Sequence, residues 1–513
     1  MIEKYSMLVL YLTILVIISI IASKRVNNIK GYITGNKTLG YWVAAFSAQT
    51  TGESAWLLLG VTGMGAMVGF SAYWVVVGEL FGVGVAWFFM AERYKKLTDQ
   101  YDSITMTDYL VSRFKAKSHT LRIVASVSLA VFILIYISAQ IDATGSAFER
   151  FLEWDYHVGA IVGFVFVVIY SVIGGFTAVA WTDTFQGAVM VLSLVALPLV
   201  AYMMLGPSDH VYDTLSSIDP GLVSMWGNGG FTPMNFATVL GMMLIGLGFL
   251  GSPQVFARFL AIKSVEEIRR GRWIALLFTL LVDASAVSVG VLGRYLFTEM
   301  GTDPVEVLGN GAQNVLPTLV EYVFPSILVG LYVAAVLSAI MSTVSSLLIV
   351  AAGSITHDIY RKMFNSELDG AKSANVSRWL TIIFALLALA LTIIISFVSP
   401  TRTIFWFVIF GWSGIAAVFC PMVIMSLFWR GFTARGAIAA MIAGFMMTIL
   451  AKFVFSEIDV IGPYFVAMET MPPAFLFSFI IGYIVSIMMP DKELADNYDK
   501  DIRKITKRGQ YNG

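Results

Sequence analysis

The sequence has 513 residues, of which 58% are hydrophobic and 13% are charged, so an aqueous fold could not hide its apolar side chains. Its formal net charge is +0 and its basic residues are scattered, which excludes the basic stripe that nucleic-acid binding requires. One cysteine, Cys420, and four separated histidines exclude a disulfide framework and a thiolate metal site, and argue against structural zinc or haem. The lipid bilayer is therefore the expected solvent for nearly the whole chain.

The first apolar stretch, Met7 to Ser23, is expected to be a retained membrane helix. A signal peptide carries its positive charge before the apolar segment, whereas here Lys24 and Arg25 follow it, and no small-residue cleavage site comes next. We therefore interpret this stretch as the first span.

Apolar runs long enough to cross a bilayer recur from end to end. An odd number of spans places the two termini on opposite sides of the membrane. The runs predict about thirteen transmembrane helices, over residues 7–23, 41–64, 69–91, 120–147, 158–175, 179–205, 235–252, 273–298, 326–352, 378–397, 403–429, 434–455 and 473–489.

The distribution of basic residues predicts the orientation. If the N-terminus is outside, about 28 of the 33 basic residues, among them Arg258 to Arg272, lie in inner segments. The outer loops 207–232 and 299–325 contain acidic residues but no Lys or Arg. We therefore expect a cell-membrane protein with its C-terminus inside, where the polar tail 491–513 is too short to form a domain.

The second predicted helix contains a polar cluster, Ser47 to Trp56, with glycine in the middle of a span. Polar residues at this depth are costly unless they line a cavity, bind an ion or pair with another helix. A packing seam of small residues would also explain the cluster. Gly52 and the neighbouring hydroxyls favour a broken helix with exposed carbonyls.

The seventh predicted helix contains three glycines followed by a proline, Gly246 to Pro253. The segment matches the dinucleotide fingerprint GxGxxG, but a membrane span lacks the strand, the helix and the water that this motif needs. Glycines and a proline here indicate unwinding, and unwound segments in two halves of a chain are typical of a transporter binding site.

The ninth predicted helix places hydroxyls on several neighbouring turns, from Ser338 to Ser346. Such hydroxyls can simply bond to carbonyls of their own helix. As a cluster they also suit sodium, a hard cation that prefers oxygen ligands.

Isolated acids occur in other predicted spans, at Glu79, Asp142, Asp183 and Asp283. Asp183 fits a cap at a helix start near the inner face. Asp283 lies deeper and fits a proton relay or a buried pair. These acids are secondary candidates, whose roles the sequence leaves open.

Two other functional classes fit the sequence less well. An enzyme should carry a convergent acid, base, nucleophile or metal constellation, and no such pattern occurs. A channel should show a continuous polar stripe or a repeated filter element, whereas this sequence shows two broken helices. The expected function is transport on an ion gradient, with no cofactor other than a coupling ion.

Several segments together resemble the sodium:solute symporter family, and within it the sodium/proline symporters. The likeness runs over nearly the whole chain in matching order. It is carried by Ser47 to Gly60, Phe176 to Thr184, Pro253 to Phe259, Ala339 to Thr343, Trp412 to Gly414 and Arg435 to Ala437.

The resemblance implies an all-α membrane fold with a LeuT-type core of two five-helix inverted repeats. It implies a symporter that imports a small solute, with L-proline as the leading candidate, by alternating access driven by sodium. The implied divisions are an extra helix and inner loop over 1–40, a transport core over 41–429 with repeats 41–205 and 235–429, two further helices over 430–490, and the tail 491–513.

The resemblance also implies the binding residues. The implied sodium ligands are the carbonyls of Thr50, Glu53 and Ala339 and the hydroxyls of Ser342 and Thr343. The implied solute site comprises Ser54, Ala55, Tyr136, Ile245, Phe249 and Pro253.

The chain departs from the family pattern at both sites. Gly52 stands where sodium/proline symporters have an aspartate important for sodium, and Glu53 follows one place later. Ile245 and Phe249 stand where the sodium/proline symporters have Trp and Tyr. Proton coupling, and a different solute such as another amino acid, a carboxylate, a sugar or a vitamin, therefore stay open as alternatives.

Overall fold

The computed structural model describes residues 2–24, 29–206, 210–364, 370–399 and 402–510, so the predicted inner residue Arg25 lies outside the described residues. In this part of the chain the structure is almost wholly helical, and the only strand-like pairing is one isolated bridge between Leu39 and Ile262. Helices satisfy every backbone group within one segment, which the bilayer core requires.

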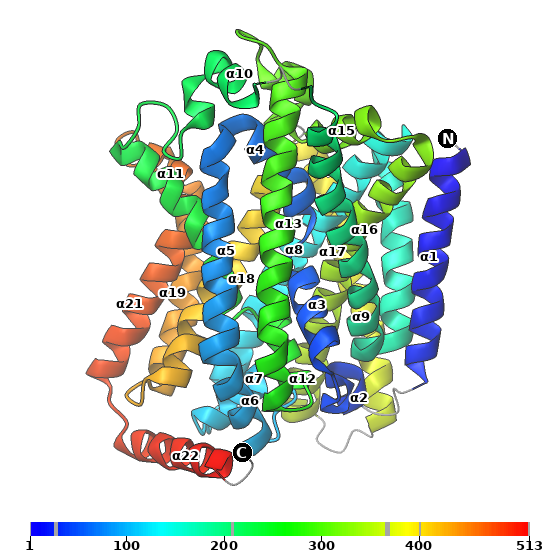
Figure 1. Ribbon diagram of the computed structural model, residues 1–513. Coiled ribbons are helices and arrows are strands. Elements are labelled where there is room, and N and C mark those ends of the chain that lie inside the picture. Colours follow the sequence, from blue (N-terminus) through cyan, green and yellow to red (C-terminus); the bar gives the residue numbers. More distant parts are fainter. Residues whose placement is uncertain (1, 25–28, 207–209, 365–369, 400–401, 511–513) are drawn as a thin grey trace.

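Eleven helices in the described ranges are long and apolar enough to cross a membrane, and Tyr156–Val172 is a shorter apolar helix. One of the eleven, Trp56–Gln100, reverses direction between α4 (Thr62–Val68) and α5 (Tyr73–Val85) (Figure 1). Gly69, which follows α4, has a φ of 62°. Among the described residues the path therefore makes thirteen crossings, as predicted, and the two ends lie at opposite ends of the bundle (Figure 1).

The helices that build the spans are α1 (Ile2–Ser23), α3 (Tyr41–Gly52), α4 (Thr62–Val68), α5 (Tyr73–Val85), α6 (Ala91–Gln100), α8 (Thr120–Leu152), α9 (Tyr156–Met203), α11 (Pro233–Leu244), α12 (Pro253–Ala261), α13 (Val265–Phe297), α16 (Ser326–Gly353), α17 (Gly370–Val398), α18 (Ile404–Phe428), α19 (Ala434–Phe453) and α21 (Met471–Met488). Further helical segments connect or extend them: α2 (Ile29–Thr34), η2 (Trp56–Val61), η4 (Ala86–Met90), α7 (Met106–Arg113), α10 (Val211–Ile218), η6 (Ile245–Leu250), α14 (Pro304–Leu308), α15 (Val315–Val323), η8 (Ser354–Phe364), α20 (Gly462–Met468) and α22 (Lys492–Gln510).

Two helices form the centre of the bundle. The most apolar windows of Ser326–Phe364 and Ile404–Phe428 are 94% buried, against 22% for Lys372–Val398. The last segment exposes large apolar side chains such as Trp379 and Phe397, which suit contact with lipid rather than with water. The hydroxyl-rich ninth span therefore lies at the most protected place in the fold.

Both predicted helix breaks are present. Helix α3 ends at Gly52, and Glu53 is extended, with φ −80° and ψ 101°, before helical backbone resumes at Ala55. The seventh span is interrupted between η6 and α12, where Ser252 is extended. Each break follows a glycine, because glycine leaves the helix at little steric cost.

A sharp kink separates the fifth and sixth predicted helices. They are the two arms of α9, which follow each other without a loop and meet at Gly175, where φ is 56° and ψ is −162°. A Cβ there would lie 2.8 Å from the ring of Tyr32. A residue with a side chain would therefore strain both the backbone and the packing.

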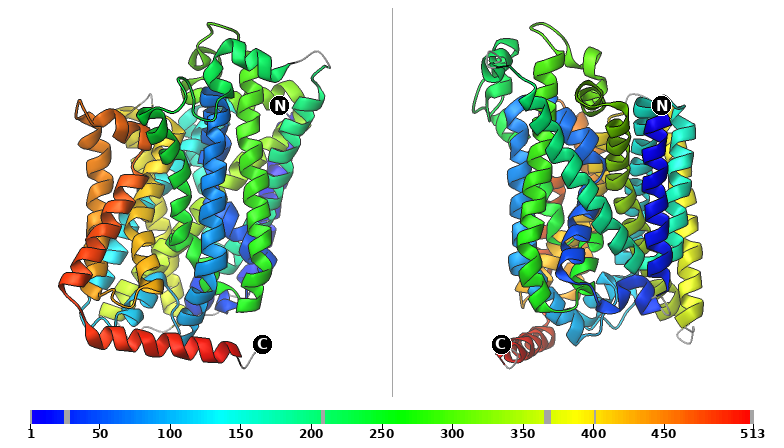
Figure 2. Two further views of the ribbon diagram at one scale, coloured as in Figure 1. Left: turned by 60° about the vertical axis from the view of Figure 1, so that its left-hand side comes forward. Right: turned by 45° about the vertical axis from the view of Figure 1, so that its right-hand side comes forward.

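The tail forms the amphipathic helix α22, which lies across the end of the bundle (Figures 1 and 2). The Tyr498 hydroxyl donates to the Leu427 carbonyl at 2.7 Å and accepts from Arg93 at 2.6 Å. Arg430 pairs with Asp499 at 3.2 Å. The polar tail is thus docked on the bundle and adds no separate domain.

Candidate functional site

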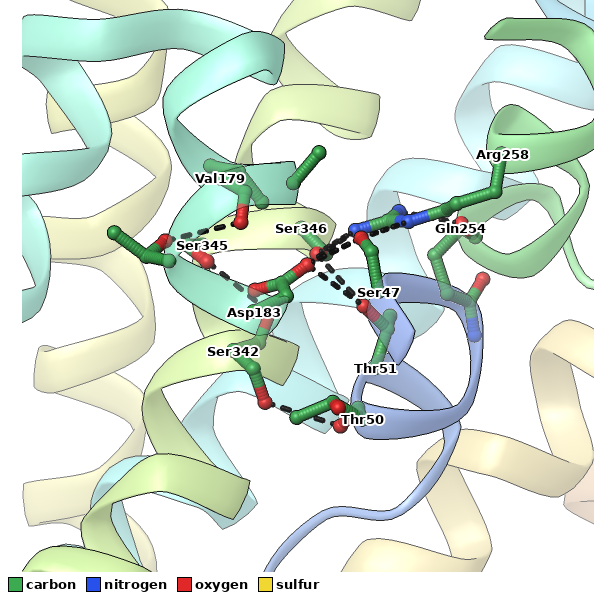
Figure 3. Close-up of polar contacts among 12 residues, drawn as sticks. Ser47, Thr50, Thr51, Val179, Asp183, Gln254, Arg258, Ser342, Ser345 and Ser346 are labelled. Atoms are coloured by element: carbon green, nitrogen blue, oxygen red, sulfur yellow. Dashed lines mark hydrogen bonds and ion pairs between the residues drawn. The ribbon is translucent and has the colours of Figure 1, made fainter. Parts of the chain in front are cut away.

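The hydroxyls of α16 face the break of α3. Ser342 Oγ lies 3.0 Å from the carbonyl of Thr50 and 3.0 Å from that of Ala339. Thr343 Oγ1 lies 3.0 Å from the carbonyl of Thr51 and 3.1 Å from that of Ala339 (Figure 3 shows the Ser342–Thr50 contact). The structure therefore brings together four of the five residues predicted to bind sodium.

Each of these hydroxyls meets two carbonyl oxygens but carries one proton, so it can donate to only one of them at a time. Ser342 and Thr343 do bond to their own helix, as the packing alternative expects. Each also leaves one close oxygen–oxygen contact without a proton. A cation placed between such oxygens would satisfy them, and carbonyl and hydroxyl oxygens are ligands that hard cations accept.

Glu53, the fifth predicted ligand, lies at the same break, but its side chain turns elsewhere. One of its carboxylate oxygens lies within 4.8 Å of one oxygen each of Glu79 and Asp283, and all three residues are fully buried. Two of the isolated acids of the sequence therefore meet Glu53 in space.

A buried ion pair lies beside the hydroxyl cluster (Figure 3). Arg258 Nη2 lies 2.9 Å from Asp183 Oδ2 and also contacts the hydroxyl of Ser346. Ser47 donates to the same carboxylate oxygen at 2.6 Å, and Thr51 lies 3.4 Å from it. This network joins α3, α9, α12 and α16 where the first helix breaks.

One expectation is corrected by this pair. Asp183 does not cap a helix start; it lies inside α9 and is fully buried. Arg258, the other member of the pair, is also fully buried. Sequence hydropathy could not find the pair, because its members are 75 residues apart, although each is a charged residue in an otherwise apolar run.

Three of the predicted solute residues converge on the break from the other side. The Ser54 hydroxyl lies 3.3 Å from the Tyr136 hydroxyl and 3.1 Å from Gln140 Nε2. Gln140 Oε1 also accepts the backbone N–H of Ala55 at 3.1 Å. Gln140 was missed from the sequence, although it lies one helical turn after Tyr136 and is polar within an apolar helix.

The remaining aromatic wall is organised by Trp412. Its indole N–H donates to the Ile245 carbonyl at 3.1 Å, and its ring packs edge-on against Phe249 at 5.4 Å and Tyr136 at 6.2 Å between centroids. A Cβ on Gly52 would lie 2.5 Å from the Phe249 ring. Phe249 therefore fills the space that a side chain at position 52 would need, which gives a physical reason for the glycine there.

Pro253 does not join this group. It begins α12 and lines a small cavity with Thr105, Leu129 and Ser354. None of the other five predicted solute residues lines that cavity. Five of the six predicted residues thus form one buried cluster between the two broken helices, and the sixth lies apart.

Asp142, the last of the isolated acids, has a separate role. Its carboxylate pairs with Arg402 and accepts from Tyr156. The contacts join α8, the start of α9 and the segment before α18. Asp142 is therefore paired in a structural contact outside the cluster of predicted binding residues.

Comparison with known proteins agrees with the fold. The profile of the sodium:solute symporter family matches residues 32–444. The high-affinity proline transporter PutP of Bacillus subtilis is 31% identical over 492 residues, which cover 94% of this chain and 98% of that protein. The sodium/proline symporter of Escherichia coli is 31% identical over 443 residues, which cover 86% of each chain.

Solved structures show the same architecture. A sodium-coupled sialic acid symporter in a substrate-bound outward-open state superposes with a TM-score of 0.77 at 17% identity, over 96% of this chain and 98% of that one. MhsT in complex with L-phenylalanine superposes with a TM-score of 0.54 at 14% identity, over 86% of this chain and 98% of that one. The LeuT-type fold that the resemblance implied is confirmed, and the protein is a multi-span membrane transporter rather than an enzyme. Because the family profile covers most of its length, the chain belongs to the sodium:solute symporter family.

Proposed function

We propose that this protein imports L-proline together with sodium by alternating access. The transport core would comprise residues 41–429, with inverted repeats over 41–205 and 235–429. The N-terminus would lie outside the cell and the C-terminus inside. The relatives named proline transporters support this solute, since they match the chain along most of its length.

One observation carries the sodium assignment. Ser342 and Thr343 on the central helix reach the carbonyls of Thr50 and Thr51 where α3 breaks. We assign the sodium site to Thr50, Glu53, Ala339, Ser342 and Thr343, with Glu53 contributing its backbone carbonyl. Sodium binding there would hold α16 against the broken helix and so link ion occupancy to the arrangement of the helices.

The solute site is assigned to the buried cluster between the breaks. Ser54, Tyr136 and Gln140 supply polar groups, while Phe249 and Trp412 supply apolar walls. Ligand sites commonly combine apolar walls with a few placed polar groups. Ala55 and Ile245 belong to the same cluster, and Pro253 stays a prediction that its position apart does not support.

A second solute is favoured by a specific feature. Ile245 and Phe249 stand where sodium/proline symporters have Trp and Tyr, so two hydrogen-bonding groups are replaced by apolar ones. A larger or more apolar solute than proline would fit this wall better. The mechanism and the sodium site would be unchanged.

The test is uptake of labelled proline into proteoliposomes, with and without an inward sodium gradient, against a panel of unlabelled competitors. Concentrative uptake that needs sodium and is inhibited first by unlabelled proline supports the proposal. Sodium-driven uptake that another competitor inhibits more strongly identifies the second solute. Uptake driven by a pH step in sodium-free vesicles would contradict the sodium assignment.

Orientation needs its own test. Asn228 lies before α11, at the end of the bundle that we assign to the outside. Arg270 lies near the start of α13, at the other end of the bundle, and both residues are exposed. In a chain with Cys420 replaced, a cysteine at position 228 should react with an impermeant reagent in intact cells, and one at position 270 should react only after permeabilisation. The reverse pattern would contradict the proposed topology.

A further inference from the structure

An imidazole and two carboxylates meet at the end of the bundle where the C-terminus lies (Figure 1). Asp108 lies on α7, and His357 and Asp358 lie on η8. One ring nitrogen of His357 and one oxygen of each carboxylate all lie within 4.8 Å of one another. We call these three residues the Asp–His–Asp cluster.

His357 points into the cluster without a hydrogen bond. Its side chain is only 5% exposed, and both ring nitrogens, Nδ1 and Nε2, are buried without a partner among the described residues. Nε2 lies 3.6 Å from Asp108 Oδ2. A protonated imidazole would form an ion pair there but would still leave the Nδ1 proton unpaired. Buried polar groups are normally satisfied, so this ring needs a further reason for its position.

The carboxylates of the cluster are held in place by their neighbours. Asp358 accepts hydrogen bonds from Thr105 and Arg122, each at 2.9 Å, and from Ser354 at 3.1 Å. Thr105 also caps α7, because its hydroxyl accepts the backbone N–H of Asp108 at 2.9 Å. The two acids are therefore fixed relative to each other, and such supporting bonds are typical of metal ligands.

The charges of the cluster leave room for a cation. Arg122 lies 2.9 Å from Asp358 and 3.6 Å from Asp108, and no other Lys or Arg among the described residues forms an ion pair with either acid. Two carboxylates thus share one guanidinium, and with a neutral imidazole one negative charge is left over. The Asp108 side chain is 14% exposed, so an ion can reach this charge from the solvent.

The spacing suits a four-coordinate transition-metal ion. Zinc lies about 2.0–2.2 Å from imidazole nitrogen and carboxylate oxygen, so neighbouring ligand atoms of a tetrahedral site are roughly 3.4 Å apart. The 3.6 Å between His357 Nε2 and Asp108 Oδ2 is close to that value and is too long for a good hydrogen bond. Imidazole suits zinc, whereas magnesium and calcium prefer oxygen ligands. The separated histidines of the sequence do not exclude such a site, because carboxylates supply the other two ligands.

The backbone that carries His357 and Asp358 is also unusual. The segment η8, Ser354–Phe364, is a π-helix of 11 residues that continues α16. π-Helical turns are rare and occur frequently at functional sites.

We propose that Asp108, His357 and Asp358 bind one divalent transition-metal ion, of which zinc fits best, and that the bound ion slows transport. The ion would tie α7 to η8. Because η8 continues α16, on which we place the sodium ligands Ser342 and Thr343, binding would favour the present position of the central helix over others. The effect on transport rests on the proposed function, whereas metal binding does not.

The test measures zinc binding to the full-length protein in detergent, purified without a polyhistidine tag and freed of metal with a chelator that is then removed. Titration calorimetry should show one zinc ion per chain, with which an excess of magnesium does not compete. His357→Gln keeps a polar side chain but removes the imidazole, so it should weaken zinc binding at least about tenfold. Absence of zinc binding by the unaltered protein, or unchanged affinity in His357→Gln, would overturn the proposal.

His157 provides the matched control. It also lies beside an acid, Asp155, at 3.7 Å, but it is partly exposed and belongs to no group of three possible metal ligands among the described residues. His157→Gln should bind zinc as the unaltered protein does; a loss as large as that of His357→Gln would overturn the assignment.

Thermal unfolding decides the question if His357→Gln does not fold. Zinc should raise the unfolding temperature of the unaltered protein, because it binds the folded chain. Asp108→Asn, at a partly exposed position, should reduce that rise. No rise in the unaltered protein, or an equal rise in Asp108→Asn, would overturn the proposal.

Uptake gives the second measurement. Zinc supplied to both sides of proteoliposomes should slow sodium-driven uptake by the unaltered protein and by His157→Gln, but not by His357→Gln. Equal rates with and without zinc, or equal inhibition of all three proteins, would overturn the effect on transport. Zinc binding by a protein that takes up no proline would contradict the proposed solute and leave the metal site standing.

Discussion

The buried acids on the two faces of α3 have opposite surroundings. On one face, Asp183 has Arg258 at 2.9 Å and two hydroxyls around its carboxylate. On the other face, Glu53 meets two further acids and, among the described residues, no base. An acid that is paired with a base keeps its charge. A buried carboxyl without a base can lose its proton only when another cation neutralises the charge. The first arrangement therefore suits a permanent structural link between helices, whereas the second provides no such link.

The largest effect is expected when the ion pair on the first face of α3 is broken. Arg258→Met removes the base and leaves Asp183 buried without a counter-charge, which should cost about 3–5 kcal/mol of stability. Thermal unfolding in detergent measures the loss, and the exposed Arg269→Gln, whose partner is Glu92, serves as the control with an expected change within about 0.5 kcal/mol. Adding Asp183→Asn to Arg258→Met should restore much of the stability; equal stability of the single variant and the unaltered protein would contradict the structural role.

The next effect concerns the two hydroxyls of the central helix α16 that face the break of α3. The double variant Ser342→Ala, Thr343→Ala removes two oxygens from the proposed sodium site, so the sodium concentration for half-maximal uptake should rise roughly thirtyfold. Ser338→Ala is the matched control, because this buried hydroxyl of the same helix contacts Tyr11 and the Ala334 carbonyl instead. If both variants show the same sodium dependence, the hydroxyls serve helix packing alone.

A smaller effect is expected at the solute wall. Phe249→Ala removes the ring that packs on Trp412 and Gly52, and the relative potency of competing solutes should change by roughly tenfold. Competition assays in proteoliposomes measure this order. A lower maximal rate with an unchanged order would identify Phe249 as a packing residue.

The smallest effect sharpens the contrast between the faces. Glu79 has no base as a partner among the described residues, so Glu79→Gln breaks no ion pair. The free energy of unfolding should therefore change by less than about 0.5 kcal/mol or should rise. Thermal unfolding of the purified variant without sodium is the measurement. A loss as large as that of Arg258→Met would show that Glu79, too, is held by a base.

Local sequence predicted the features that depend on neighbouring residues. Apolar runs predicted the spans, because their length must match the bilayer. Gly52 and the segment Gly246 to Pro253 predicted the two breaks, because glycine and proline weaken a helix wherever it lies. The resemblance to the family added the LeuT-type fold and predicted four residues of a sodium site that the structure brings together.

Tertiary structure alone decided which polar groups share a place. Asp183 and Arg258 are 75 residues apart, and Glu53 meets Asp283 from a helix in the other half of the chain. Hydropathy shows that each of these charged residues is costly to bury in a membrane. Whether the cost is offset depends on which residue faces it across a helix interface. The sequence by itself therefore determined where the chain crosses the membrane and where it unwinds. Only the packing of α3 against α9, α12, α13 and α16 decided which buried acids are paired with a base.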